Sequence, residues 1–460
     1  MLFDLIILGG GPAGYLAAER AAHAGLKVAL AEERALGGVC LNEGCIPTKA
    51  LLYSAKLYDG AKYGEKYGVT AEGLALDHAA VLRRKNKVVR SLTAGVKAQM
   101  KAGGVTVLTG RGVIVGRQDD AFAMQAGEET VTGRNLLIAT GSQPAVPPIE
   151  GLQDGLARGF VLTNREILDL AEVPERLCVI GGGIIGLELA SYFCSAGSQV
   201  SVVEMLDHIA GDTDQDLVAI LKADMAKRGI RFELEAKVTA IEEHGVRYEQ
   251  GGESRLIEAD KVLLSIGRRA NTRDIGLEAL GVQVERGAVT TDEYMRTNIP
   301  GVYAAGDVNG RSMLAHTAYR EAEVAVNHML GQADAMRYDA IPAVLYTNPE
   351  LATVGETEAS AMAKDITFRT VKLPMRFAGR YQAENEGGQG VMKLLVNPQD
   401  GTILGAQVLS NYASEFIVAV AGWMEMGVTL SQIKKIVFPH PTVGEILREA
   451  VFQYQPEDDA

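Results

Sequence analysis

Two cysteines, Cys40 and Cys45, lie five residues apart in the segment GGVCLNEGCIPTK, and their thiols could carry redox chemistry. In a regular helix, residues at this spacing are separated by a rise of ~7.5 Å and point well apart. A disulfide requires Cα atoms within ~7 Å. Because Gly44 and Pro47 can distort the chain, a disulfide is feasible only in an irregular turn. The alternative is a pair of inert, buried thiols.

The chain has only four cysteines in 460 residues, which is too few for a secreted disulfide framework. Any chemistry that they carry is therefore expected in a reducing compartment. Cys178 and Cys194 fall in an expected strand and an expected helix. We interpret these two as inert buried thiols.

A candidate base, His440, lies near the end of the chain in the segment FPHPTVGE. An isolated histidine is more often structural than catalytic. Here Glu445 follows five residues later and could orient the imidazole and stabilise its cation. Pro441 keeps His440 out of the helical region, and the peptide bond between them is a candidate for the cis form. The segment therefore predicts a general base.

Two similar glycine-rich motifs indicate the elements that position this chemistry. GGGPAG begins at Gly9 and GGGIIG begins at Gly181. From Gly9 to Glu32, and from Gly181 to Glu204, the spacing is the same 23 positions. Each motif follows an apolar strand, opens a helix and leads to a second strand ending at the acid, as a Rossmann βαβ unit requires. The expected strands and helices are 2–8, 15–25 and 27–32 in the first unit, and 176–180, 187–197 and 199–204 in the second.

Each residue of such a motif has its own task. The first glycine permits a tight turn, the second leaves room for a pyrophosphate at the helix N-terminus, and the third allows helix and strand to pack closely. The acid accepts hydrogen bonds from ribose hydroxyls. Glu204 has no Lys or Arg in the sequence VVEMLDHIAGD around it, which favours NAD over NADP. The predicted nucleotide-binding residues are Gly9, Gly11, Pro12, Ala13, Gly14 and Glu32 in the first unit, and Gly181, Gly183, Ile184, Ile185, Gly186 and Glu204 in the second.

Two further apolar strands end in small residues, at 135–142 and 297–307. Both fit a dinucleotide lying along a large sheet. Asp307, at the end of the second, could be a helix N-cap, and we favour a contact to a cofactor hydroxyl instead. From Ile341 onward the pattern changes to an α+β module. Its expected elements are strands at 346–355, 390–397 and 403–410 and a helix at 412–427.

Composition excludes several classes of protein. The chain is 47% hydrophobic and 22% charged, which is ordinary for a globular protein. Its net charge of -13 repels phosphate backbones, so no nucleic-acid partner is expected. No apolar run approaches the ~18 residues of a membrane span. The first residues, MLFDLIILGG, resemble neither a signal nor a transit peptide, so we expect a cytoplasmic protein that binds no membrane.

Taken together, the segments GGGPAGY, GGVCLNEGCIPTKALL, GGGIIGLE, AAGD, MLAH and HPTVGE extend over nearly the whole chain. They resemble the flavin-dependent pyridine nucleotide–disulfide oxidoreductases of the glutathione-reductase type. The resemblance implies an α/β fold with two Rossmann-like dinucleotide-binding domains, for FAD and NAD, and a C-terminal α+β dimerisation domain. The implied parts are 1–148 for FAD, 149–268 for NAD, 269–339 for a central domain completing the FAD site, and 340–460 for the interface.

The resemblance also implies roles. Cys40 becomes the interchange thiol that meets the substrate, and Cys45 the thiol lying against the flavin. Lys49 approaches the reactive flavin nitrogen and pairs with Glu188, while the histidine–glutamate pair reaches the active site from the partner subunit of a homodimer. No metal is implied. Further implied cofactor contacts are Glu33, Gly38, Val39, Gly112, Ala139, Thr140, Gly141, Gly267, Arg268, Gly306, Met313, Leu314, Ala315 and His316.

Members that oxidise dihydrolipoyl groups and reduce NAD are the most similar. The implied partner is then a lipoyl-bearing carrier: an acyltransferase of a 2-oxo acid dehydrogenase complex, or the carrier of the glycine-cleavage system. The tail VFQYQPEDDA has no cysteine pair, which disfavours mercuric reductases and the larger thioredoxin reductases. Another flavin disulfide reductase, a diaphorase or NADH oxidase, and a scaffold with an idle disulfide remain alternatives. One departure is Phe438 and Pro439 before His440, where dihydrolipoyl-oxidising members often have His and Ala.

Overall fold

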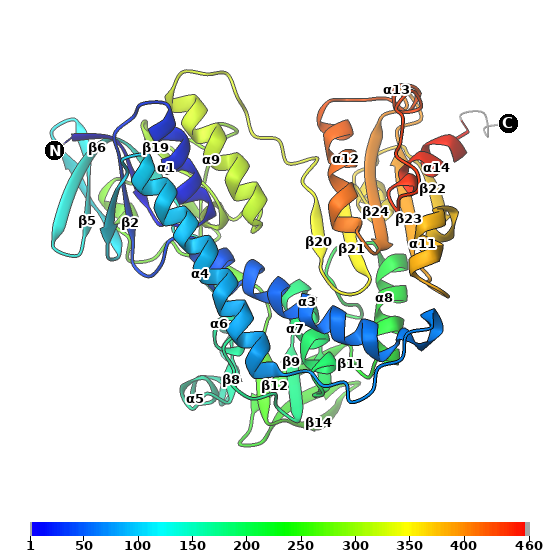
Figure 1. Cartoon of the computed structure of the whole chain (residues 1–460). Coiled ribbons are helices and arrows are strands. Elements are labelled where there is room, and N and C mark those ends of the chain that lie inside the picture. The colour runs from blue at the N-terminus through cyan, green and yellow to red at the C-terminus, as the bar shows by residue number, and fades with distance from the viewer. Residues whose placement is uncertain (1, 456–460) are drawn as a thin grey trace.

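The computed structural model describes residues 2–455, which form three groups of strands and helices (Figure 1). The first sheet lies nearest the N-terminus and the third nearest the C-terminus, with the second between them in sequence. The three groups correspond to the expected α/β fold with two Rossmann-like units and a C-terminal α+β module.

The first sheet has the order β3-β2-β1-β6-β5-β4, and β19 pairs with β6. Strands β1, β2, β3, β6 and β19 are parallel, so their carboxyl ends share one edge. Helices α1 and α9 pack against one another beside it. The elements are β1 (Leu2–Leu8), α1 (Pro12–His23), β2 (Val28–Glu32), β3 (Thr106–Thr109), β4 (Gly112–Gln118), β5 (Ala121–Ala126), β6 (Glu129–Ile138), β19 (Val302–Ala304) and α9 (Ala315–Met329).

The second sheet repeats the parallel arrangement in the order β11-β10-β9-β15-β8. A three-stranded antiparallel sheet, β12-β13-β14, flanks it. Its elements are β8 (Val161–Leu162), β9 (Arg176–Ile180), α7 (Ile184–Ser195), β10 (Gln199–Val203), α8 (Gln215–Lys227), β11 (Arg231–Glu233), β12 (Ala236–Ile241), β13 (Gly245–Gln250), β14 (Glu253–Glu258) and β15 (Lys261–Leu264).

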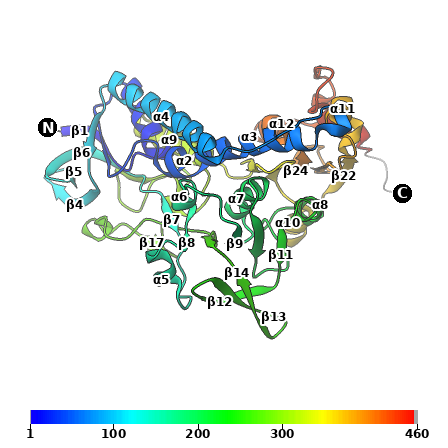
Figure 2. The same cartoon turned by 60° about the horizontal axis from the view of Figure 1, so that its bottom comes forward.

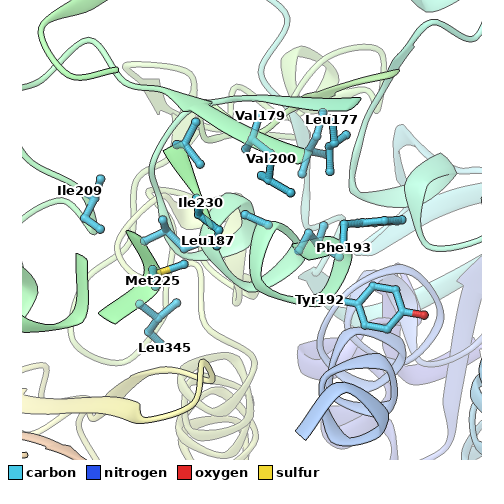
Figure 3. Close-up of a cluster of buried hydrophobic side chains, with 14 of the residues drawn as sticks. Leu177, Val179, Leu187, Tyr192, Phe193, Val200, Ile209, Met225, Ile230 and Leu345 are labelled. Atoms are coloured by element: carbon cyan, nitrogen blue, oxygen red, sulfur yellow. The ribbon is translucent and has the colours of Figure 1, made fainter. Parts of the chain in front are cut away.

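A buried cluster fixes α7 on the second sheet (Figure 3). Burying each large apolar side chain of this kind stabilises the fold by roughly 1.5–3 kcal/mol. The cluster therefore holds the glycine loop at the start of α7 in one place. It includes Leu177, Val179 and Val200 from the strands and Leu187, Tyr192 and Phe193 from α7.

Two long helices, α3 (Cys45–Lys62) and α4 (His78–Ala102), connect the groups (Figures 1 and 2). They pack on one another, and α3 also packs on α7. Helix α4 was not predicted from the sequence. Its start carries a local signal, since Asp77 caps it by accepting a hydrogen bond from the Ala80 N–H at 2.9 Å.

The third sheet is antiparallel, in the order β20-β21-β24-β23-β22. The expected strand at 346–355 is wrong in its first half, because β21 begins only at Glu350. Pro349 just before it has no N–H to donate to a neighbouring strand. Its elements are β20 (Ala343–Leu345), β21 (Glu350–Gly355), β22 (Arg369–Pro374), β23 (Val391–Val396), β24 (Ile403–Ser410), α12 (Ala413–Glu425) and α14 (Glu445–Gln453).

The remaining elements are short and lie between the sheets or at their edges. The helices are α2 (Gly38–Glu43), α5 (Leu152–Ala157), α6 (Asn164–Ile167), α10 (Glu358–Ala363), α11 (Gly379–Glu384) and α13 (Leu430–Ile433). The strands are β7 (Ser142–Pro144), β16 (Arg268–Ala270), β17 (Val284–Glu285) and β18 (Ala288–Val289). Within residues 2–455, no helix combines the length and apolar character that crossing a membrane requires.

A buried ion-pair cluster ties the third sheet to the second group. Lys393 on β23 is 2% exposed, and its ammonium lies 2.9 Å from Asp214, 2.8 Å from Asp216 and 2.7 Å from Glu358. Asp214 also caps α8 by accepting the Leu217 N–H. Charges taken out of water need such partners, because an unpaired buried charge is costly.

Lys393→Met should therefore lower the free energy of unfolding by about 3–5 kcal/mol, since it leaves the buried Asp214 carboxylate without its cation. The matched control is Lys372→Met, which removes a half-exposed partner of Asp216 and should cost about 0–1 kcal/mol. Urea titration followed by circular dichroism measures both. Equal, small losses would mean that this cluster does not hold the two groups together.

Candidate active site

One continuous cavity of about 2020 Å³ runs between the three groups. This is larger than the ~300–1,000 Å³ of a pocket for a drug-sized ligand. It passes the first glycine loop and both cysteines and reaches Gly183 and the first turn of α7, where the second glycine loop ends. The cavity thus has room for a dinucleotide and brings the motifs of distant sequence together.

The first glycine loop has the predicted geometry. Gly9 has φ +100°, and a Cβ there would lie 2.3 Å from the Ala139 carbonyl oxygen. Gly11 has free space around it, because a Cβ there would meet no atom nearer than Gly38 Cα at 3.8 Å. A Cβ on Gly14, by contrast, would lie 1.8 Å from the Gly9 carbonyl oxygen. The tight turn, the open cradle and the close helix packing expected of this motif are confirmed.

The second glycine loop has the same backbone geometry as the first at the corresponding glycines. Gly181 has φ +101°, and a Cβ on Gly186 would lie 2.3 Å from the Gly181 carbonyl oxygen. A Cβ on Gly183 would meet no atom nearer than the Ser265 carbonyl oxygen at 4.0 Å. Both loops therefore leave backbone N–H groups at a helix N-terminus open to a phosphate.

The two acids brace these loops. Glu32 accepts a hydrogen bond from the Gly10 N–H at 2.8 Å, and Glu204 accepts one from the Gly182 N–H at 2.7 Å. This bracing role was not foreseen from the sequence. Glu32 also lines the cavity. The contact of each acid to a ribose stays a prediction.

The cysteine segment is irregular, as a disulfide requires. Helix α2 ends at Glu43, Gly44 departs from helical geometry with φ -147° and ψ -108°, and α3 begins at Cys45. The thiols of Cys40 and Cys45 are free in this structure and hydrogen-bonded to one another. Both line the cavity. The irregular turn, which the sequence analysis named as the condition for a disulfide, is therefore present.

The two thiols differ in acidity. The hydrogen bond from Cys40 and the nearby Lys49 ammonium lower the pKa of Cys45 to about 7, against the opposing effect of burial. The same hydrogen bond, together with burial, raises the pKa of Cys40. Cys45 is therefore the more acidic thiol of the pair, and Cys40 the thiol that keeps its proton to higher pH. A thiolate is the reactive form of a cysteine.

This asymmetry predicts one thiolate titration in the reduced protein with a midpoint of about 7. Because the pKa of Cys45 is lowered, its thiolate should be present above that pH and be lost below it. The ultraviolet absorbance of the thiolate in reduced, desalted protein measures this, with a Cys45→Ser variant subtracted. A midpoint at the ordinary cysteine value near 8.5 would contradict the assigned pair.

Lys49 and Glu188 form the predicted ion pair. The Lys49 ammonium donates to both carboxylate oxygens of Glu188, at 2.9 and 3.0 Å. Lys49 lies one turn after Cys45 on α3, and Glu188 lies on α7 with its side chain 4% exposed. The pair therefore joins the cysteine helix to the second glycine unit.

Asp307 is not an N-cap, so the alternative interpretation of this residue is wrong. It is the first residue of a 3-10 helix at Asp307–Asn309, whose N-cap is Gly306. Its carboxylate accepts a hydrogen bond from the Ser142 hydroxyl and lies 3.9 Å from Arg268 Nε. Asp307 lines the cavity, and its contact to a cofactor hydroxyl stays a prediction.

Unpartnered hydroxyls in the cavity fit a polar ligand. The side-chain oxygens of Thr290 and Thr291 are buried, have no hydrogen-bond partner and belong to residues that line the cavity. Leaving a buried hydroxyl unpaired costs about 1–3 kcal/mol. Together with the open glycine cradle, these groups fit a large phosphate-bearing and hydroxyl-bearing cofactor.

His440 lies outside the cavity of its own chain. Its Nδ1 is 2.8 Å from Glu445, and Glu445 also accepts the Thr442 N–H at 2.8 Å. The His440–Pro441 bond is cis, as proposed from the sequence. The His440 side chain is 77% exposed. One chain therefore builds the oriented imidazole but does not bring it to the thiols.

The cavity gathers most of the predicted residues. Those that line it are Gly9, Gly11, Pro12, Ala13, Glu32, Glu33, Gly38, Val39, Cys40, Cys45, Lys49, Gly112, Ala139, Thr140, Gly141, Gly183, Ile184, Ile185, Glu188, Gly267, Arg268, Gly306, Asp307, Met313, Leu314, Ala315 and His316. Those that do not are Gly14, Gly181, Gly186, Glu204, His440 and Glu445. Lining residues that the sequence analysis missed include Ser142, Asn164, Tyr319 and Tyr346.

Known proteins resemble this chain over nearly its whole length. Dihydrolipoyl dehydrogenase from Chlamydia muridarum is 37% identical over 449 residues, covering 97% of this chain and 96% of the relative. Dihydrolipoyl dehydrogenase from Geobacillus stearothermophilus is 37% identical over 457 residues, covering 97% and 95%. Among solved structures, LpdA from Mycobacterium tuberculosis superposes with a TM-score of 0.90 at 28% identity, covering 98% of this chain and 99% of that one.

Another solved structure is the HOCl-induced flavoprotein disulfide reductase RclA from Escherichia coli, in a Cu(II) complex. Its TM-score is 0.86 at 27% identity, and it covers 99% of this chain and 100% of that one. Residues 3–322 match the model of the pyridine nucleotide-disulphide oxidoreductases, and residues 341–451 match the dimerisation domain of the same family. The chain therefore belongs to the pyridine nucleotide-disulphide oxidoreductase family.

Proposed function

We propose that this enzyme oxidises dihydrolipoyl groups to lipoyl disulfides and reduces NAD+ to NADH. The observation that carries the proposal is the position of Cys40 and Cys45 at the break between α2 and α3, in a cavity that also reaches both nucleotide-binding units. Relatives named dihydrolipoyl dehydrogenase, at 36–38% identity over 97% of the chain, support this choice of substrate.

FAD and NAD are the cofactors of this family of enzymes and of this chain. The cradle of Gly9 and Gly11, with the unpartnered threonine hydroxyls and Asp307, would hold FAD, and the loop from Gly181 would hold NAD. When bound, FAD would supply a two-electron carrier between the cysteine pair and the nicotinamide. Lys49 and Glu188 would lie between these two sites.

The thiol half of the reaction uses the side chains of two subunits. His440 of the partner subunit accepts a proton from one substrate thiol, and the resulting thiolate attacks the Cys40 sulfur of the disulfide. The Cys40–Cys45 bond breaks and Cys45 leaves as a thiolate. The second substrate thiol then attacks the sulfur bonded to Cys40, which closes the lipoyl disulfide and releases Cys40 as a thiol.

The dimer completes this site. Residues 341–451 form the dimerisation domain and include His440. The exposed His440 imidazole, held by Glu445, is consistent with use across a subunit interface. Glu445 would hold the imidazole in one tautomer and stabilise its cation, as carboxylates do in catalytic triads.

The coenzyme and the partner follow from the same proposal. Glu204 would repel a 2′-phosphate, so NAD is favoured over NADP. The dihydrolipoyl group would arrive on a carrier protein, either an acyltransferase of a 2-oxo acid dehydrogenase complex or the glycine-cleavage carrier. The cytoplasm is the proposed compartment, because four cysteines in 460 residues are too few for a secreted disulfide framework.

The initial rate of NAD+ reduction by dihydrolipoamide tests the proposal directly. The paired control is NADPH oxidation by oxidised glutathione, which Glu204 should disfavour. We expect a fast first reaction and a silent control. If the FAD-loaded protein is silent with dihydrolipoamide, the proposed substrate is wrong and other disulfides become the substrates to test.

A further inference from the structure

Tyr346, which comes from the third sheet region, contacts both Lys49 and Glu188. It lies in the loop between β20 and β21, within the dimerisation domain. The centre of its ring is 4.3 Å from the Lys49 ammonium nitrogen, and its backbone N–H donates to Glu188 at 2.9 Å. One residue therefore contacts both members of the pair, and α3, α7 and the third sheet meet at this point.

The Tyr346 ring restricts the position of the Lys49 ammonium more than the ion pair alone does. Two N–H groups of the Lys49 ammonium are directed at the Glu188 carboxylate, but the Lys49 side chain is 32% exposed and long enough to swing. An aromatic face attracts a cation and limits where the ammonium can lie. Tyr346, Lys49 and Cys45 all line the same cavity.

We propose that Tyr346 is a positioning residue whose ring holds the Lys49 ammonium at the redox centre, so that the dimerisation domain completes that centre within its own chain. The inference rests on the proposed use of Cys45 and Lys49. It assigns a task to a residue that contributes neither to the disulfide nor to the glycine loops.

The position of the Lys49 ammonium should affect the pKa of Cys45 through the charges of Lys49 and Glu188. The Lys49 ammonium favours the Cys45 thiolate, whereas the Glu188 carboxylate opposes it. If the ammonium moves away, the pKa of Cys45 should rise. The titratable groups that act on Cys45 or are acted on by it are Cys40, Lys49, Glu188, Arg268, Tyr319 and Tyr346.

Two variants of the full-length, FAD-loaded enzyme separate the ring from the rest of the residue. Tyr346→Leu removes the ring but keeps the backbone N–H to Glu188, and Tyr346→Phe keeps both. Lys49→Met removes the ammonium altogether and so gives the largest shift of the Cys45 titration midpoint that loss of this charge can produce. We expect the midpoint of the Cys45 thiolate titration to rise in Tyr346→Leu by roughly half a pH unit or more, towards that of Lys49→Met. The midpoint of Tyr346→Phe should stay at the wild-type value.

The outcomes distinguish the inference from the proposed function. If Lys49→Met raises the midpoint and Tyr346→Leu does not, the inference is wrong and the proposed use of Lys49 stands. If Lys49→Met has no effect, the proposed role of Lys49 fails first. Equal shifts in both tyrosine variants would assign the effect to the hydroxyl and overturn a role for the ring. Unchanged flavin content in every variant excludes misfolding as the cause of a shift.

Discussion

Cys40→Ser should abolish the oxidation of dihydrolipoamide while the transfer of electrons from NADH to a dye continues. The substrate thiolate attacks the Cys40 sulfur, and a serine oxygen can neither form the disulfide nor the mixed disulfide with substrate. We expect the dihydrolipoamide rate to fall by at least about a thousandfold, as when a covalent nucleophile is removed.

The chain offers a matched control for this substitution. Cys194→Ser changes a half-buried thiol on α7 that donates to the Arg228 carbonyl oxygen, and a serine hydroxyl can make the same bond. This variant should keep near wild-type rates in both assays. A Cys40→Ser enzyme that retained its dihydrolipoamide rate would show that the disulfide is idle and would favour an oxidase or scaffold.

His440→Gln should slow the thiol half-reaction by roughly a hundredfold to ten-thousandfold, the usual contribution of a general base. Electron transfer from NADH to a dye does not require deprotonation of the substrate thiol, so its rate should stay within a small factor of wild type. His244→Gln is the matched control, because His244 is 81% exposed and lies in the second group. Equal losses in both assays would contradict the assignment of the base.

Mixed dimers test whether this base acts across the interface. Co-expressed Cys40→Ser and His440→Gln chains form a heterodimer in which one site has both defects and the other has neither, if each site draws on both subunits. Activity should then return to about a quarter of wild type when the subunits assort randomly. If the base acts within its own chain, every site carries one defect and no activity returns.

Local sequence determined the glycine loops because their requirements are local. The turn at Gly9, the open backbone at Gly11 and the close packing at Gly14 each concern atoms within a short βαβ unit, and the acid at Glu32 ends the next strand of that unit. The break before Cys45 was predictable for the same reason, since Gly44 and Pro47 lie beside it. These features need no knowledge of distant parts of the chain.

Other features were supplied by resemblance and depend on tertiary contacts. Lys49 and Glu188 lie 139 residues apart in sequence, and only the packing of α3 on α7 makes them an ion pair. No periodicity or spacing links these two positions. The resemblance to a family assigned the pair, and the folded structure supplies its geometry.

The sequence by itself therefore determined the two nucleotide units, the irregular segment at the cysteines and the pairing of His440 with Glu445, because each is encoded within a short segment. Only the tertiary structure decided how they are joined: Tyr346 reaches Glu188 across 158 positions, and the acidity of Cys45 depends on a hydrogen bond and an ammonium in three dimensions. Contacts between remote segments depend on how helices and sheets pack, and hydrophobic packing does not specify a partner by sequence distance.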